Sequence, residues 1–179
     1  MKKSFLPVLL GSDENVYGMA RAFHEAYNIN SVAIAKKNYI PTRYSKIITV
    51  HSFDNFDLED VFIKTVMDMG RKLLQDYEHL LLIPCSDRYM ELSIKNRGVL
   101  STVYSNRFID EELLNKIITK DKFYELLEEH KMDYPKTVVA TRENMSDCME
   151  LPFDYPIVIK AANSNGIEWL RCKIANKKK

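Results

Sequence analysis

The stretch that decides the fold is Leu6-Pro7-Val8-Leu9-Leu10-Gly11-Ser12-Asp13-Glu14-Asn15. Its first half is a short, continuous apolar run, which is typical of a strand buried on both faces of a sheet. Its second half is a turn in which Ser12 and Asp13 can cap the start of a helix. The segment therefore predicts a strand that passes directly into a helix.

The same alternation of strand and helix continues along the chain. Between residues 16 and 27 the apolar side chains recur at steps of three and four, which predicts a helix with one apolar stripe. Further strands are expected at residues 31–35, 46–50, 80–83 and 99–104, and a long amphipathic helix at residues 58–77. This order indicates an α/β fold with a mostly parallel sheet and helices on both of its faces.

The character of the sequence changes near residue 105. Beyond it we expect charged helices at residues 110–118 and 121–130, a strand at 137–140, a helix around 142–149 and a strand at 157–161. Residues 168–174 can pair back on the last strand across a turn at residues 163–166. We therefore predict two domains, residues 1–105 and residues 106–179.

Two loops of the first domain carry polar groups where ligands of parallel sheets usually bind, beyond the carboxyl ends of the strands. These loops are residues 11–15 and 84–88, and their candidate substrate-binding residues are Ser12, Asp13, Asn15, Asp87 and Arg88. Asp87 can equally serve as an N-terminal cap of the next helix, and Arg88 can be a plain surface charge. Both alternatives stay open at this point.

Composition excludes several classes of protein. The 26 basic and 25 acidic residues leave a formal net charge of +1, which gives no drive toward nucleic acid or anionic lipid. The apolar runs are far shorter than the roughly 20 residues of a membrane helix, and the first residues resemble a strand rather than a signal peptide. We expect a cytoplasmic protein with neither a nucleic-acid nor a membrane partner.

Familiar motifs of catalysis and metal binding are missing from the sequence. It contains no P-loop, no G-x-G-x-x-G fingerprint and no G-x-S-x-G elbow. The cysteines are odd in number and widely spaced, and the histidines show no ligand-like spacing: Cys85, Cys148, Cys172, His24, His51, His79 and His130. We predict reduced cysteines and no metal site built from these residues.

Two segments of the second half carry a resemblance to a known family. The first is Thr119-Lys120-Asp121-Lys122-Phe123-Tyr124, which runs on to Tyr134-Pro135-Lys136-Thr137, and the second is Tyr155-Pro156-Ile157-Val158-Ile159-Lys160. In order and spacing they resemble the start of an ATP-grasp domain. In that superfamily an Asp-Lys pair opens a helix that ends before a short P-x-T strand, and a second lysine follows an apolar strand.

The resemblance implies roles for individual residues of this second half. Lys122 and Lys160 would contact the phosphates of ATP, and Asn163 and Ser164 would supply further donors. A lysine suits this task because its ammonium group is a compact charge that neutralises phosphoryl oxygens. Lys122 alone could also be a solvated helix residue. The loop after Lys160 is glycine-rich in the superfamily, whereas here it offers only Gly166, which a plain hairpin turn would explain equally well.

The first half resembles the domain that precedes ATP-grasp in the D-aspartate ligase-like branch of carboxylate–amine ligases. Residues 7–23 and 84–89 carry this resemblance. It implies a Rossmann-like pre-ATP-grasp substrate domain followed by an incomplete first ATP-grasp lobe. It also implies an ATP- and Mg²⁺-dependent ligase that joins a small carboxylate or amino acid to an amine through an acylphosphate.

The family's magnesium-binding carboxylates lie beyond the last residue of this sequence. We therefore expect a truncated chain without catalytic residues or metal ligands that is inactive alone. Two alternatives remain open. One is a module that binds a small molecule or a nucleotide without catalysis, and the other is a structural or regulatory protein that self-associates through an edge strand near residues 168–174.

Overall fold

The structure is a computed structural model, and it describes residues 2–141, 143–144, 151–160 and 173–175. The chain divides into two compact units, Met1–Asp110 and Glu111–Lys179. The first unit holds a four-stranded sheet and the second a two-stranded sheet. In the described part of the chain, no helix combines the length and apolar character that crossing a membrane requires. That the two units serve as a substrate domain and a nucleotide-binding lobe stays a prediction.

The sheet of the first unit is entirely parallel and has the strand order β3-β2-β1-β4. Its strands are β1 (Lys3–Leu10), β2 (Ser31–Ala35), β3 (Ile48–Ser52) and β4 (Tyr77–Pro84). Leu10 pairs with Ile34 on one side and with Pro84 on the other. The carboxyl end of the central strand β1 is therefore flanked by the carboxyl ends of β2 and β4.

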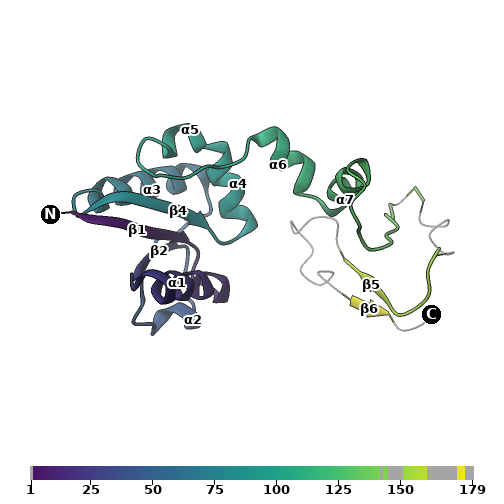
Figure 1. The fold of residues 1–179 in the computed structure, drawn as a ribbon, viewed down its shortest axis with the longest axis horizontal. Helices are drawn as coiled ribbons and strands as arrows, with labels where there is room; N and C mark the ends of the chain where they lie inside the picture. The colour runs from purple at the N-terminus through teal and green to yellow at the C-terminus, as the bar shows by residue number, and fades with distance from the viewer. Residues whose placement is uncertain (1, 142, 145–150, 161–172, 176–179) are drawn as a thin grey trace. The chain divides into compact units, whose positions relative to one another are not determined.

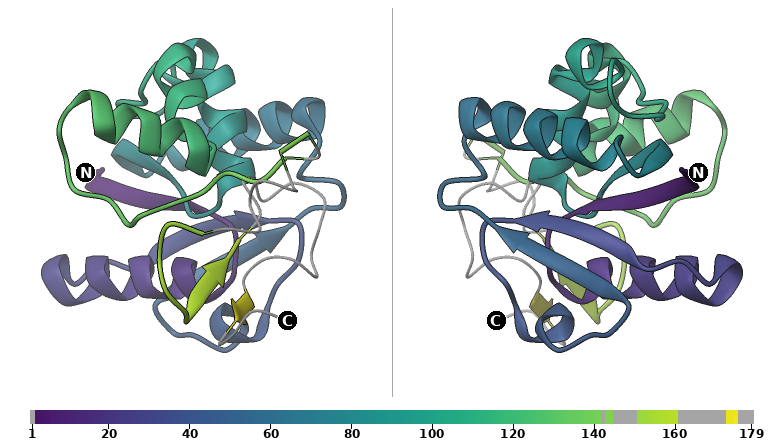
Figure 2. Two further views of the ribbon diagram at one scale, coloured as in Figure 1. Left: turned by 90° about the vertical axis from the view of Figure 1, so that its right-hand side faces the viewer. Right: turned by 90° about the vertical axis from the view of Figure 1, so that its left-hand side faces the viewer.

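Helices cover both faces of this sheet (Figures 1 and 2). One face carries α1 (Glu14–Tyr27) and α2 (Ile40–Arg43), and the other carries α3 (Glu59–Leu73), α4 (Asp87–Lys95) and α5 (Arg97–Leu100). The strand residues divide accordingly, because Leu9 packs with Val16 of α1 while Val8 belongs to the cluster of Phe62 on α3. The predicted α/β fold with helices on both faces is confirmed.

One predicted element of the first unit is wrong, and another ends earlier than expected. The expected strand at residues 99–104 is the end of α5 followed by turns, in which Leu100 and Tyr104 are buried while Ser101 and Thr102 are exposed. The apolar spacing there is four, not the two of a half-buried strand. The expected helix at residues 58–77 ends at Leu73, because Tyr77 is already paired with β1 through Lys3.

The second unit begins with two short helices, α6 (Glu111–Ile117) and α7 (Lys120–Glu129), as predicted. Strands β5 (Ile157–Ile159) and β6 (Lys173–Ala175) form an antiparallel pair, so the chain returns onto the 157–161 strand at residues 173–175, at the end of the segment 168–174 that was expected to pair there. The turn expected at residues 163–166 lies outside the described residues. Residues 137–140 form no strand, since they are mostly exposed and no described strand pairs with them. The helix expected around residues 142–149 lies almost wholly outside the described residues.

Candidate functional site

The candidate site of the first unit lies where the strand order reverses. The chain moves from β1 to β2 and β3 on one side and then crosses to β4 on the other side of β1. The loops that leave β1 and β4 consequently diverge, and a crevice between such loops is the usual ligand site of a parallel α/β sheet. These are the two loops, residues 11–15 and 84–88, that the sequence singled out.

The loop after β1 turns sharply at Gly11. Its backbone φ of +120° is one that residues with a side chain rarely adopt. A Cβ atom at this position would also lie 3.0 Å from Cγ2 of Val16. Asp13 then caps α1, because its Oδ1 accepts hydrogen bonds from the N–H groups of Asn15 and Val16 at 3.1 and 3.2 Å. Asn15 is exposed in the first turn of the helix. The predicted residues Asp13 and Asn15 thus stand together at the amino end of α1.

Ser12 faces inward and fastens this loop to the one after β2. Its side chain is 2% exposed, and its hydroxyl donates to the carbonyl of Lys37 and accepts from the N–H of Tyr39 at 3.3 Å. The hydroxyl of Thr42 donates in turn to the Ser12 carbonyl at 2.7 Å. The structure therefore gives Ser12 a positioning role in the loop, and its part in substrate binding stays a prediction.

The loop after β4 leads into α4, and Ser86 rather than Asp87 is the N-cap residue. The Ser86 hydroxyl accepts from the N–H of Tyr89, and Asp87 is the first residue of the helix. Arg88 donates to the Asp57 carbonyl from Nε at 3.2 Å and from Nη2 at 2.9 Å, while its side chain stays half exposed. A guanidinium has five N–H donors, so Arg88 keeps capacity for a carboxylate.

Two ion pairs lie near Arg88, whose charge acts on both of their carboxylates. Lys36, which directly follows β2, pairs with Asp57 at 2.9 Å, and this hydrogen bond is the main reason that the pKa of Asp57 lies below its ordinary value. In the second ion pair, Lys95 of α4 lies 2.6 Å from Glu59 of α3. The pKa of Glu59 is also lowered, mainly by its hydrogen bond from Lys95 and then by the one from Asn96. Both carboxylates are therefore ionised at neutral pH.

Beneath the rim two side chains remain neutral at physiological pH. Burial raises the pKa of the Cys85 thiol to about 11, and the nearby charge of Asp13 adds to the shift. Burial likewise raises the pKa of Tyr89, whose ring centroid lies 5.2 Å from that of Phe56. A neutral, raised-pKa thiol is a poor nucleophile, so this geometry assigns Cys85 to packing.

The sequence analysis missed Lys36, Asp57, Glu59 and Lys95. Lys36 directly follows the predicted strand at 31–35, so the rule that ligands gather beyond strand ends could have found it. Asp57 follows β3 by five positions, and its partnership with Lys36 joins residues 21 positions apart. Glu59 and Lys95 belong to helices whose contact depends on the fold alone.

The predicted nucleotide contacts lie in the second unit. Lys122 is in the first turn of α7 after Asp121, and Lys160 directly follows β5, and both side chains are exposed. Val158 and Ile159 are 56% and 45% exposed, so the apolar strand that precedes Lys160 is not buried. Asn163 and Ser164 lie outside the described residues. Among the described residues, no group of His, Cys, Asp and Glu side chains could hold a metal ion.

Comparison with known proteins supplies the missing context. A D-aspartate ligase of Enterococcus faecium (strain Aus0004) is 40% identical to this chain over 181 residues, an alignment that covers 99% of this chain and 42% of the ligase. The chain is homologous to the amino-terminal part of D-aspartate ligase. It therefore spans less than half the length of that relative. No family model matches the chain.

A solved structure supports the same assignment of the fold. The crystal structure of an L-amino acid ligase from Bacillus licheniformis superposes with a TM-score of 0.59 over 99% of this chain and 40% of the other. The sequence identity is only 11%, so this likeness concerns the fold alone. With the D-aspartate ligase homology it confirms the resemblance predicted from the sequence, for the amino-terminal portion of such ligases.

Proposed function

We propose that this chain forms the substrate domain and the beginning of the nucleotide-binding lobe of an ATP-dependent carboxylate–amine ligase that acts on an acidic amino acid. The observation that carries this proposal is the 40% identity to a D-aspartate ligase along 99% of the chain. The polar residues in the loops at the strand-order reversal support it independently, because ligands of parallel sheets usually bind there.

In this proposal the crevice of the first unit receives the amino acid. Arg88 supplies N–H donors to a substrate carboxylate, and the amino ends of α1 and α4 add the favourable field of their helix dipoles. Asp13, Asn15 and Asp87 supply polar contacts on the same rim, with Asp87 able to meet an ammonium group. Ser12 holds the first loop in place through its bonds to the Lys37–Tyr39 segment.

In the second unit Lys122 and Lys160 neutralise phosphate oxygens of ATP, joined by donors from Asn163 and Ser164. Transfer of the γ-phosphoryl group of ATP to the carboxylate would give an acylphosphate and ADP. An amine would then attack the acyl carbon, forming the amide and releasing phosphate and a proton. The resemblance also implies Mg²⁺. The described residues do not fit a magnesium site, so we assign the ion to none of them.

A calorimetric titration of the 179-residue chain with Mg-ATP, compared with Lys160→Ala and Lys122→Ala, tests the nucleotide half of the proposal. A charge-assisted contact contributes about 1.5–3 kcal/mol, so either substitution should weaken binding roughly ten- to a hundredfold. Lys136→Ala, another exposed lysine of the second unit, is the matched control and should bind like the native chain. Equal weakening by all three variants would refute the assigned contacts.

A second titration, with D-aspartate, tests the crevice. Arg88→Ala should weaken binding by roughly the same factor, whereas Arg107→Ala, at an exposed arginine outside the crevice, should leave it unchanged. Heat from Mg-ATP without any from D-aspartate would favour the alternative of a nucleotide-binding module. Absence of heat from both ligands at millimolar concentration would contradict binding by this chain.

A further inference from the structure

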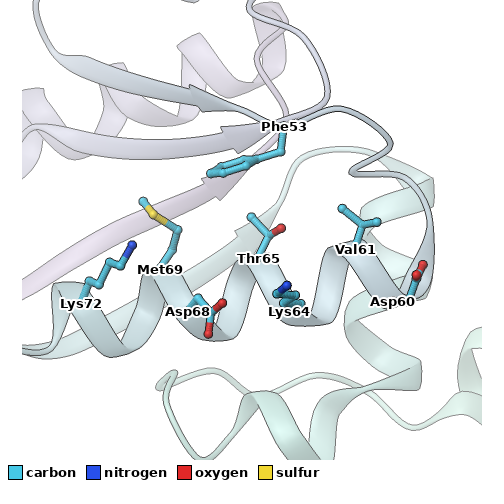
Figure 3. Close-up of a pocket in the computed structure, with 8 residues that line it drawn as sticks. All are labelled: Phe53, Asp60, Val61, Lys64, Thr65, Asp68, Met69 and Lys72. Carbon is cyan, nitrogen blue, oxygen red and sulfur yellow. The ribbon is translucent and has the colours of Figure 1, made fainter.

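A groove of about 580 Å³ runs along α3 (Figure 3). None of the candidate site residues described above lines it, although Asp60 directly follows Glu59. Val61, Thr65 and Met69 follow one another at helical spacing along its floor, and Phe53, from just beyond β3, overhangs them. Phe53 keeps 36% of its surface exposed. The strand that Phe53 leaves, β3, is an edge strand of the sheet. The groove is therefore an open, partly apolar surface at one edge of the first unit.

A row of alternating charges borders this groove. Asp60, Lys64, Asp68 and Lys72 all line it, and all four side chains are exposed. They recur every four residues, so they lie on one side of α3 over about 18 Å of its length. Read from the amino end the signs are minus, plus, minus, plus, and read from the carboxyl end they are plus, minus, plus, minus.

Because of this order of signs, the row of charges is complementary to a second copy of itself that runs in the opposite direction. If a second α3 lies antiparallel across the groove, every charge faces an opposite one, whereas a parallel arrangement in register places like charges together. Antiparallel helices related by a two-fold axis are the geometry of an isologous dimer. Among the described residues, the charged groups of Asp60, Lys64 and Lys72 have no oppositely charged group within 4.0 Å, and Asp68 is 3.5 Å from Arg71.

We propose that the α3 groove is the interface of a two-fold homodimer of this chain. Asp60 faces Lys72 of the partner subunit and Lys64 faces Asp68 of the partner subunit, each pair occurring twice by symmetry. Phe53, Val61 and Met69 provide the apolar centre beneath this polar rim, as in other protein interfaces. This surface differs from the edge strand near residues 168–174 through which the sequence suggested self-association.

Sedimentation velocity of the full chain, from low micromolar to roughly 100 micromolar protein, tests the proposal. The native chain should show a concentration-dependent monomer–dimer equilibrium. Lys64→Asp places like charges opposite each other twice and should raise the dissociation constant at least tenfold. The double variant Lys64→Asp/Asp68→Lys restores opposite charges across the interface and should recover most of the native affinity.

The two variants are matched inside the helix. Each variant creates two pairs of like charges at four-residue spacing along the row. Positions 60 and 64 form one pair in both; the other is 64 and 68 in the single variant and 68 and 72 in the double variant. Their effects on helix stability are therefore similar. The double variant also loses the attraction between Asp68 and Arg71, which works against recovery. Recovery by the double variant therefore reports the contact between subunits.

A charge-matched control and a check of folding complete the experiment. Arg107→Asp changes the net charge as Lys64→Asp does, but it lies next to the segment in which Ser105 bonds to Leu80 of β4, at the opposite edge of the sheet. It should not alter the dissociation constant. Circular dichroism should show that all variants remain folded. A native chain that stays monomeric throughout, or a double variant no tighter than Lys64→Asp, would overturn the proposal.

Discussion

Ser12 illustrates how one hydroxyl positions the candidate site. It is 2% exposed and joins the loop after β1 to that after β2 through the Lys37 carbonyl and the Tyr39 N–H. Ser12→Ala leaves both backbone groups without this partner, which should lower the free energy of unfolding by about 1–3 kcal/mol. Urea denaturation measures the change. Ser101→Ala, which removes an exposed hydroxyl bonded to the Gly98 carbonyl, is the control and should cost less than about 0.5 kcal/mol. Equal costs for both variants would contradict the positioning role.

Tyr104 predicts a dependence of stability on alkaline pH. Its buried hydroxyl donates to the Val66 carbonyl at 2.7 Å, and burial raises the pKa of Tyr104 in the folded state. In the unfolded chain the group ionises near pH 10. The stability that its neutral form contributes is therefore full below about pH 10 and is lost as the pH rises toward the folded pKa. Tyr104→Phe should lower stability at pH 7 by about 1 kcal/mol and reduce the loss between about pH 9 and pH 11. Urea denaturation across this range measures both proteins. If the assignment were wrong, the stability of Tyr104→Phe would depend on pH in the same way as that of the native chain.

At the level of single residues, the sequence predicted the loops at the ends of β1 and β4 better than it predicted the contacts of their side chains. The polar residues Asp13 and Arg88 were found because strand ends can be recognised from short apolar runs. That Ser86 rather than Asp87 caps α4 depends on a one-residue difference in where the helix begins. The inward orientation of Ser12 could not be predicted, because its partners come from another loop. The nucleotide-binding roles of Lys122 and Lys160 remain predictions from resemblance.

Helix α3 depends on a glycine where it packs closest to the chain that follows α5. A Cβ atom on Gly70 would lie 2.4 Å from Cγ1 of Val103 and 2.8 Å from the Tyr104 hydroxyl oxygen. Gly70→Ala should therefore destabilise the protein by about 1–3 kcal/mol, although alanine is the better helix former. Gly18→Ala in α1 is the matched control, since its Cβ would meet nothing within 4 Å and should add up to about 1 kcal/mol of stability. Chemical denaturation measures the stability of both variants. A Gly70→Ala variant more stable than Gly18→Ala would refute the packing argument.

Elements with a clear period were predictable, and those decided by distant contacts were not. The strands of the parallel sheet and helix α1 follow from apolar runs and from one helical stripe. Residues 99–104 were misassigned because Val99, Thr102 and Val103 favour strands locally, while Gly70 and Val66 of α3 hold Tyr104 in a turn. Helix α2, which has Pro41 in its first turn, was missed because it is four residues long.

On the scale of the whole molecule, the buried apolar clusters among the described residues belong to the first unit. Both clusters of buried side chains lie between Leu6 and Phe108, one on each face of the sheet. In the second unit, α7 has no buried residue, and Leu114 of α6 is 9% exposed. Hydrophobic burial is the main source of stability in a folded domain, so most of the stability of the chain should come from residues 1–110.

This distribution predicts that residues 1–110 fold alone. A fragment ending after Asp110 keeps both core clusters and the bond from Ser105 to Leu80 of β4, so its free energy of unfolding should lie within about 1 kcal/mol of that of the sheet unit in the full chain. A fragment ending after Leu100 loses the Tyr104 ring and its hydrogen bond to Val66, and should be destabilised by about 3 kcal/mol or more. Urea denaturation followed by circular dichroism compares the two fragments with the native chain. An unfolded 1–110 fragment would mean that the second unit stabilises the sheet directly, and the two units would then have to be treated as one cooperative domain.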